Sequence, residues 1–183
     1  MELTARLVKI KILVCDVDGV LTDGTIYKGP DGLEFKRFSV TDGAGFFLAR
    51  AGGLKTALIS GRYSAATEAR AQELTVDAVY NGVVNKLVPY AEIKQRFGLT
   101  DENIAYLGDD LIDVPVMERA GLPIAVKNAY DPVKQQAVYV TEKSGGEGAV
   151  REVIDLILQG QGKYQQALEN LRREHYGDQH EQQ

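Results

Sequence analysis

The sequence predicts an α/β fold, a doubly wound three-layer sandwich in which helices cover both faces of a mostly parallel sheet. Short apolar segments alternate with segments of helical composition along the chain, and strands that alternate with helices form parallel sheets. Several of these apolar segments end in a cluster of Asp, Ser or Gly residues. The 183 residues, 44% of them hydrophobic and 26% charged, suffice for one domain with a sizeable core.

Each predicted strand is a short β-rich run bounded by turn residues. The first, at 10–15, has the composition of a buried central strand. A β-hairpin follows at about 25–40, because residues 29–32, Gly-Pro-Asp-Gly, supply a turn between two segments of strand composition. The remaining predicted strands are 54–60, 77–80, 103–107, 123–126 and 138–140.

Glycine and proline delimit the predicted helices. Gly52 and Gly53 end one helix and Gly98 ends a later one, whereas Pro89 is tolerated because it lies in a first turn. The predicted helices are 44–51 (after a loop at 39–43), 64–74, 86–97, 112–120, a short helix from 132, 149–158 and 163–174.

The predicted domain comprises residues 1–160, with the hairpin at about 25–40 as a flap. Residues 161–183 are expected to form a C-terminal helix and a mobile polar tail. The helix has one apolar face and lies outside the predicted core, so it is placed to reach a neighbouring subunit. The intervals 22–60 and 60–86 are both too short to hold an inserted domain.

The bulk composition excludes several classes of partner. A net charge of -5 argues against nonspecific nucleic-acid binding. The chain has one cysteine, Cys15, so an intrachain disulfide is impossible, which suits a reducing cytoplasm. We find neither a signal-peptide core at the N-terminus nor an apolar stretch long enough to span a bilayer. These features predict a cytoplasmic protein with neither a nucleic-acid nor a membrane partner.

Two carboxylates follow the first predicted strand directly. Asp16 and Asp18 are two residues apart, so both side chains project from the carboxyl end of the strand in the same direction. That end is where open α/β sheets bind ligands. Neighbouring carboxylates repel one another, which raises a pKa or recruits a cation. A lone Asp-x-Asp is equally compatible with a polar loop after a core strand.

Three further polar stretches also follow predicted strands. Ser60-Gly61-Arg62 offers a hydroxyl and a close backbone approach, and Lys86 begins a helix, where the macrodipole disfavours a cation. The third stretch, at 108–113, contains Asp109, Asp110 and Asp113. Taken singly, these stretches read equally as a plain turn, a surface lysine and a solvated acidic loop.

The order of the four stretches resembles the motif set of the haloacid dehalogenase superfamily of phosphotransferases over about residues 8–158. The resemblance implies that Asp16 is the nucleophile and Asp18 the general acid and base. Ser60 and Lys86 would hold the phosphoryl oxygens. The implied cofactor is Mg²⁺, with ligands from Asp16, the backbone carbonyl of Asp18, and Asp109.

Two more acidic residues have implied supporting roles. Asp113 is expected to orient Lys86 or a metal-bound water, and Asp110 is a weaker candidate for either task. The absence of a cap-sized interval places the chain with the capless members of the superfamily, in which oligomerisation shapes the entrance to the active site.

Finer motifs resemble the 3-deoxy-D-manno-octulosonate 8-phosphate (KDO 8-phosphate) phosphatases, a tetrameric family. They include residues 16–24, 40–43, 59–62, 85–87, 108–117 and 148–152. The implied substrate-binding residues are Asp18, Ser39, Val40, Thr41, Asp42, Gly43, Gly61, Arg62, Arg70 and Lys86. Of these, Arg62 and Arg70 are eight residues apart and are expected on nearly the same face of one helix. Arginine suits recognition of a carboxylate, although a solvated helix face is the alternative for Arg70.

Alternatives remain at two levels. The sister activity on 2-keto-3-deoxynononate 9-phosphate shares nearly all these motifs, and Glu147 stands where some family members carry a basic residue. A receiver-like signalling domain also uses a strand-end Asp, an acidic pair, a Ser or Thr and a Lys, but in a different order along the chain. A catalytically idle oligomeric scaffold is the third hypothesis, which the intact motif residues disfavour.

Overall fold

The computed structural model describes residues 2–177, so the end of the predicted mobile tail, 178–183, lies outside the described residues. Six strands form one sheet in the order β5-β4-β1-β6-β7-β8, and every neighbouring pair is parallel. The strands are β1 Ile12–Cys15, β4 Lys55–Ser60, β5 Ala78–Asn81, β6 Ile104–Gly108, β7 Leu122–Ala125 and β8 Tyr139–Val140. The predicted parallel sheet is confirmed.

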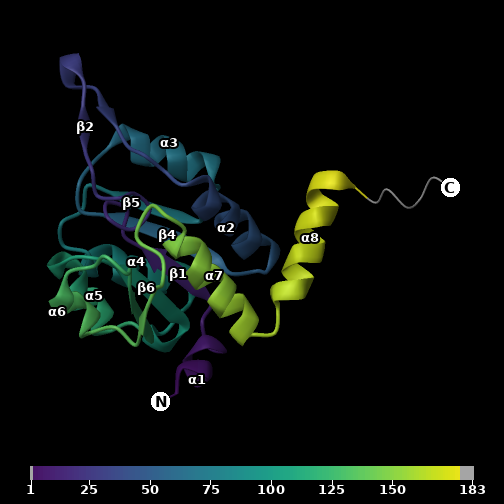
Figure 1. Ribbon diagram of the computed structural model, residues 1–183. Helices are drawn as coiled ribbons and strands as arrows, with labels where there is room; N and C mark the ends of the chain where they lie inside the picture. The colour runs from purple at the N-terminus through teal and green to yellow at the C-terminus, as the bar shows by residue number, and fades with distance from the viewer. Residues whose placement is uncertain (1, 178–183) are drawn as a thin grey trace.

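Helices cover both faces of this sheet (Figure 1). One layer contains α2 Val40–Ala51, α3 Ala65–Glu73 and α7 Ala149–Gly160, with α1 Leu3–Leu7 and α8 Tyr164–Tyr176 beside it. The other layer contains α4 Leu87–Phe97, α5 Val114–Met117 and α6 Asp131–Lys134. The doubly wound three-layer sandwich predicted from the sequence is therefore confirmed. Among residues 2–177, no helix combines the length and the apolar character needed to cross a bilayer.

Strand β1 is the centre of the molecule. All four of its residues are buried, and it pairs with β4 on one side and with β6 on the other. The chain passes from β1 to β4 and β5, then crosses back to β6, so the order of strands reverses at β1. The carboxyl ends of β1, β4 and β6 therefore lie side by side at the switch point of the sheet, where α/β folds bind ligands.

The predicted hairpin is present as a flap that extends away from the sheet (Figure 1). Its strands β2 Tyr27–Lys28 and β3 Glu34–Phe35 are antiparallel, and the short 3₁₀ helix η1 Pro30–Gly32 forms its tip. The paired strands are shorter than the sequence suggested, with two residues each. Within the described residues, neither the β1–β4 nor the β4–β5 connection holds a cap domain.

Helix α2 begins earlier than predicted. Residues 40–43, expected as a loop, form its first turn, because the Ser39 side chain accepts a hydrogen bond from the Asp42 backbone N–H (3.4 Å) and caps the helix. Gly43 in this turn and Gly45 just after it weaken the local helical signal, which explains the error.

Helix α8 packs on its own chain. Ala167 is fully buried, and the Asn170 side-chain amide donates to the Ala51 carbonyl at the end of α2 (2.9 Å). The C-terminal helix was expected to lie outside the core and to reach a neighbouring subunit. The structure places it against α2 and α7 of its own chain, so the expectation that it lies outside the core is wrong, whereas contact with a neighbouring subunit stays a prediction.

A buried carboxylate joins α2 to α7. The Asp42 side chain is 1% exposed and accepts hydrogen bonds from the backbone N–H groups of Gly148 (3.1 Å) and Arg151 (3.0 Å). These N–H groups belong to the first turn of α7, which has no side-chain cap of its own. Asp42 thus caps α7 from another helix.

We predict that Asp42→Ala lowers the free energy of unfolding by about 2–4 kcal/mol, because it leaves two buried N–H donors unsatisfied. The melting temperature should fall by about 5–10 °C. Asp155→Ala is the matched control, since Asp155 pairs with Arg151 near the surface (2.8 Å) and should contribute less than about 1 kcal/mol. Equal losses in the two variants, measured by urea denaturation, would contradict this cap.

Candidate active site

A cavity of about 260 Å³ opens at the carboxyl edge of the sheet. Its lining residues come from the ends of β1, β4 and β6 and from the loops beside them: Asp16, Asp18, Ile26, Gly61, Arg62, Val84, Asp109, Asp110 and Ile112. A larger groove of about 790 Å³ runs along the edge strand β5 between Glu68 and Val83. That groove lacks a convergent cluster of charged groups, so the smaller cavity is the candidate site.

The loop after β1 holds Asp16 in place. The Asp16 backbone N–H continues the sheet ladder by donating to the Leu107 carbonyl (3.0 Å). Thr22 Oγ1 accepts hydrogen bonds from the N–H groups of Gly19 and Gly24, both at 3.2 Å, and so closes the loop. Gly19 has φ +86°, and a Cβ there would lie 2.0 Å from Asp109 Oδ2, so only glycine lets the two strand ends approach this closely.

Lys86 is a buried cation between two carboxylates. Its Nζ lies 2.6 Å from Asp16 Oδ2 and 2.7 Å from Asp113 Oδ1, and its side chain is 1% exposed. Burial lowers the pKa of Lys86, but the charges of Asp16 and Asp113 outweigh burial and leave the pKa raised above its ordinary value. The unfavourable position of this cation before α4 is thereby compensated.

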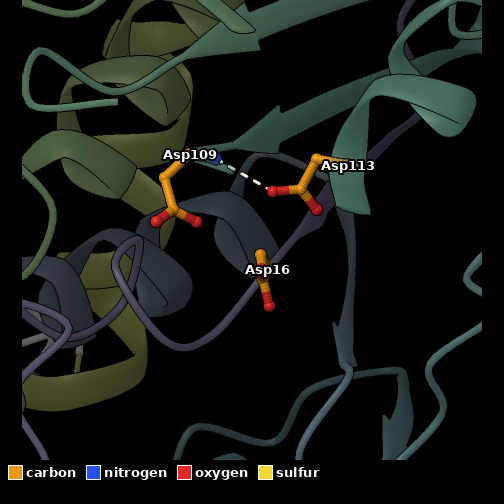
Figure 2. A group of neighbouring side chains, drawn as sticks. All are labelled: Asp16, Asp109 and Asp113. Carbon is orange, nitrogen blue, oxygen red and sulfur yellow. Dashed lines mark hydrogen bonds between the residues drawn. The ribbon is translucent and has the colours of Figure 1, made fainter. Parts of the chain in front are cut away.

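Asp113 accepts four hydrogen bonds. Its Oδ1 accepts from Lys86 and from the Tyr106 hydroxyl (2.6 Å), and its Oδ2 accepts from the backbone N–H groups of Asp109 (2.9 Å) and Asp110 (3.2 Å). Figure 2 shows the bond from the Asp109 backbone. Asp113 is thus engaged in orienting Lys86. Tyr106 was not identified from the sequence, because its position in a predicted core strand is that of any buried aromatic residue.

The carboxylates of Asp16, Asp109 and Asp113 lie close together (Figure 2). One oxygen each of Asp16, Asp109 and Asp113 lies within 4.8 Å of the others. Burial, followed by the charge of Asp113, raises the pKa of Asp16 to about 7. Burial, followed by the charges of Asp16 and Asp113, raises the pKa of Asp109 to about 8.

The cluster fits a hard divalent cation. Asp109 Oδ1 is buried and has no hydrogen-bond partner in the described chain, so this oxygen is an unsatisfied polar atom that faces the cluster. Each oxygen of Asp113 already accepts two hydrogen bonds, whereas each oxygen of Asp16 has one partner and Asp109 Oδ1 has none, so Asp16 and Asp109 are the carboxylates with lone pairs to offer. Carboxylate and carbonyl oxygens are the ligands that Mg²⁺ prefers.

Asp18 lies at the cavity with its side chain 27% exposed, and its Oδ1 is 2.7 Å from the Nζ of Lys36. Lys36 follows β3 on the hairpin and was not identified from the sequence. The sequence pattern could have indicated Lys36. Glu34 and Lys36 are two residues apart on a predicted strand, so their charged side chains point toward the same side.

Ser60 and Arg62 occupy the end of β4. Ser60 is buried, and its hydroxyl donates to the Arg62 carbonyl (2.7 Å). Arg62 lies in the loop before α3, so the expectation that Arg62 and Arg70 share one helix is wrong, because α3 begins only at Ala65. The Arg62 guanidinium makes two hydrogen bonds to Glu34 of the hairpin. These bonds hold the pKa of Glu34 well below its usual range.

The structure does not bring the other predicted substrate-binding residues to the cavity of this chain. Arg70 donates to the Ser39 carbonyl (3.2 Å) and pairs with Glu73 (2.8 Å). Gly43 packs against the Arg70 guanidinium, and Val40 is 84% exposed.

Of four further polar residues, three lie away from the candidate site and one lines it. Thr41 and Glu147 line a separate cavity of about 370 Å³ beside α7, and Asp42 is committed to capping that helix. Asp110 lines the candidate site and accepts a hydrogen bond from the Leu111 backbone (2.7 Å).

Comparison with known proteins agrees with this geometry. A family model described as haloacid dehalogenase-like hydrolase matches residues 50–154. The chain is 44% identical over 166 residues to 3-deoxy-D-manno-octulosonate 8-phosphate phosphatase KdsC of Escherichia coli (strain K12), covering 91% of this chain and 88% of the relative.

Two solved structures are similar over most of their length. The phosphatase of the same name from Yersinia pestis is 44% identical, with a TM-score of 0.87 and coverage of 88% of each chain. The one from Moraxella catarrhalis, in complex with magnesium ion, phosphate ion and a KDO molecule, is 36% identical, with a TM-score of 0.87 and coverage of 91% of this chain and 95% of that one.

The family resemblance that the sequence motifs predicted is confirmed. The matched region spans more than half of the chain and includes the ends of β4 and β6, while the alignments to the phosphatases extend over the remainder of the domain. The matches are to hydrolases, which favours this family over the two alternatives, a receiver-like signalling domain and an idle scaffold. The chain therefore belongs to the haloacid dehalogenase-like hydrolase family, within which it is similar to the capless KDO 8-phosphate phosphatases.

Proposed function

We propose that the protein is a Mg²⁺-dependent phosphatase that hydrolyses KDO 8-phosphate, a reaction of lipopolysaccharide sugar synthesis, through an aspartyl-phosphate on Asp16. The observation that carries this proposal is the pairing of Asp16 with the buried Lys86 beside Asp109 and Asp18, at the edge of a 260 Å³ cavity. The substrate follows from relatives of that name, which are 44% identical over 91% of the chain. A single cysteine, free and buried, is in keeping with a cytoplasmic site of action.

In the first step an Asp16 oxygen attacks phosphorus, and the bond to the sugar oxygen breaks. A carboxylate and a phosphate dianion repel one another, so the attack needs positive charge nearby. Lys86 supplies one charge from 2.6 Å. Mg²⁺ held by Asp16, Asp109 and the backbone carbonyl of Asp18 would supply the rest when bound. In this proposal Ser60 and Lys86 would hold the phosphoryl oxygens.

Asp18 carries out the two proton transfers of the reaction. Its carboxyl group faces the cavity from the position two residues after the nucleophile. It donates a proton to the sugar alkoxide as that group leaves, and the resulting carboxylate accepts a proton from the water that attacks the aspartyl-phosphate. The water oxygen forms the new bond to phosphorus, Asp16 is released, and Asp18 regains its proton.

The sugar must be recognised by groups that lie farther from Asp16 than the groups that hold the phosphate. Arg62 lines the cavity and has the fork geometry for a carboxylate, while in this chain its partner is Glu34. Arg70 and the stretch 39–43 lie outside the cavity of their own chain, so a role for them in binding would have to be exerted across a subunit boundary.

We further propose that the protein is a homotetramer in which neighbouring hairpins complete the entrance to the site. The hairpin residues Ile26, Tyr27, Leu33 and Phe35 are between 43% and 58% exposed in the single chain. A hairpin with two paired residues per strand is only marginally stable alone, and clustered exposed apolar side chains mark interaction surfaces. Packing against other subunits would bury this surface.

Asp16→Asn should abolish phosphate release from KDO 8-phosphate while leaving the melting temperature within a few degrees of wild type. An amide oxygen is too weak a nucleophile to attack phosphorus, so we expect less than about 1% of wild-type kcat. The assay measures inorganic phosphate with saturating Mg²⁺, and Asp155→Asn at the surface serves as the control. Substantial residual turnover would remove Asp16 from the nucleophilic role.

The same assay decides the substrate. Wild-type kcat/KM for KDO 8-phosphate should exceed that for 2-keto-3-deoxynononate 9-phosphate and for simple hexose phosphates by about tenfold or more, the scale of a few discriminating contacts. A preference for the nine-carbon phosphate would leave the reaction intact and change the substrate.

Mg²⁺ should stabilise the protein more at about pH 8 than at about pH 5.5. The folded-state pKa values of Asp16 and Asp109, about 7 and about 8, exceed their ordinary value of 3.8, so the metal-free folded state binds extra protons. The metal-free protein therefore becomes less stable as the pH rises toward 8 and these carboxyl groups lose their protons. At the lower pH, protons compete with Mg²⁺ for the same carboxylates. Near-saturating Mg²⁺ should raise the melting temperature by about 5–10 °C at the higher pH.

The control for this thermal-shift measurement is Asp109→Asn. It removes one of the two raised carboxyl groups and should lose most of the Mg²⁺-dependent shift. A shift of equal size at both pH values, or an undiminished shift in the variant, would argue against this metal site.

Light scattering at micromolar concentration should give four times the chain mass of 20.0 kDa. Phe35→Asp places a charge on the exposed apolar face of the hairpin and should shift the mass toward dimers or monomers. Val8→Asp, at a similarly exposed residue near α1, should leave the tetramer intact. A fully active wild-type monomer would defeat the proposal.

A further inference from the structure

Lys36 is buried to an extent unusual for a lysine. Its side chain is 0% exposed, although the hairpin that carries it is largely exposed. The ammonium group has two partners, Asp18 Oδ1 at 2.7 Å and the hydroxyl of Thr67 on α3 at 3.2 Å. Thr67 is itself buried, so Lys36 is held from two directions, with its charge directed at the candidate general acid.

The carboxyl group of Asp18 depends on this contact. Among residues 2–177, Lys36 is the only group that makes a hydrogen bond or ion pair with the Asp18 side chain. Asp16, in contrast, is held by both Lys86 and the Val17 backbone N–H. A partly exposed carboxylate with one partner takes its orientation from that partner.

A second ion pair also holds the hairpin against the edge of the cavity. Glu34, on the same side of the hairpin as Lys36, binds the Arg62 guanidinium in the loop after β4. The hairpin thus presents an anion to Arg62 and a cation to Asp18, an arrangement complementary to the edge of the cavity.

We infer that Lys36 is a positioning residue for Asp18: it binds one carboxylate oxygen and thereby directs the other toward the oxygen of the leaving group and, later, toward the attacking water. The inference rests on the proposed phosphatase function. Lys36 itself contacts neither phosphorus nor the sugar. Its role is to fix the geometry of both proton transfers, which lose efficiency when the group is displaced by an ångström.

The test is the phosphate-release assay on the full-length protein with KDO 8-phosphate and Mg²⁺. Lys36→Met should lower kcat by about 10²-fold and change KM by less than about threefold, because the substrate does not touch Lys36. Lys28→Met is the matched control, since Lys28 lies on the same hairpin and pairs with Glu34 (3.0 Å) but does not reach Asp18. It should retain wild-type kcat within about threefold.

A double-mutant cycle separates positioning from a general role in docking the hairpin. In an Asp18→Asn background, Lys36→Met should cause no further loss beyond about threefold, because its target is gone. A merely structural role predicts the same loss in both backgrounds. If Lys36→Met lowers the melting temperature markedly, Lys36→Gln, which keeps a hydrogen-bond donor for Thr67, takes its place in the cycle.

Three results would overturn the inference: near wild-type kcat in the Lys36 variant, an equal loss for Lys28→Met, or full additivity with Asp18→Asn. Each is measured against a wild-type enzyme that turns over. A wild-type protein that releases no phosphate from any sugar phosphate is a different result, because it rejects the proposed function itself.

Discussion

The ion pair network of Lys86 organises this molecule. One ammonium group lies between Asp16 and Asp113 with almost no exposure to solvent, and it joins the end of β1, the start of α4 and the turn after β6. A buried ammonium group costs several kcal/mol of desolvation unless its partners are close and themselves hydrogen-bonded. Asp113 meets this requirement with three other donors, so the cation is held in a defined position.

The same network leaves an excess of negative charge. Three carboxylates converge on one ammonium group, and the pKa values of Asp16 and Asp109 are raised accordingly. In the proposed mechanism, a bound divalent cation would relieve this repulsion and favour the ionised form of Asp16. The repulsion among these carboxylates is thus the property that supports the proposed metal site.

The hairpin has two chemically different sides. Toward the sheet it presents Glu34 and Lys36 to Arg62 and Asp18, and toward solvent it presents apolar side chains. The charged side seats the hairpin beside the cavity, and the apolar side is available to other subunits. One short element therefore connects the position of Asp18, the proposed proton-transfer group, with the proposed assembly, which would complete the site in a chain without a cap domain.

The sequence by itself determined the layers of the fold and the cluster of Asp16, Asp18, Lys86 and Asp109. These follow from local patterns, because strand ends of a parallel sheet meet at one edge wherever the chain places polar residues after apolar runs. The start of α2 was less well defined, since a first turn that contains Gly43 and the Ser39 cap decide it.

Only the tertiary structure decided the partners of the remaining side chains. Asp42 caps α7, more than 100 residues away in the chain, and Lys36 reaches Asp18 from a hairpin whose seating depends on Arg62. Such contacts join segments whose separation along the chain carries no information about their distance in space. Their side chains acquire a role only when packing excludes water and leaves one partner within reach.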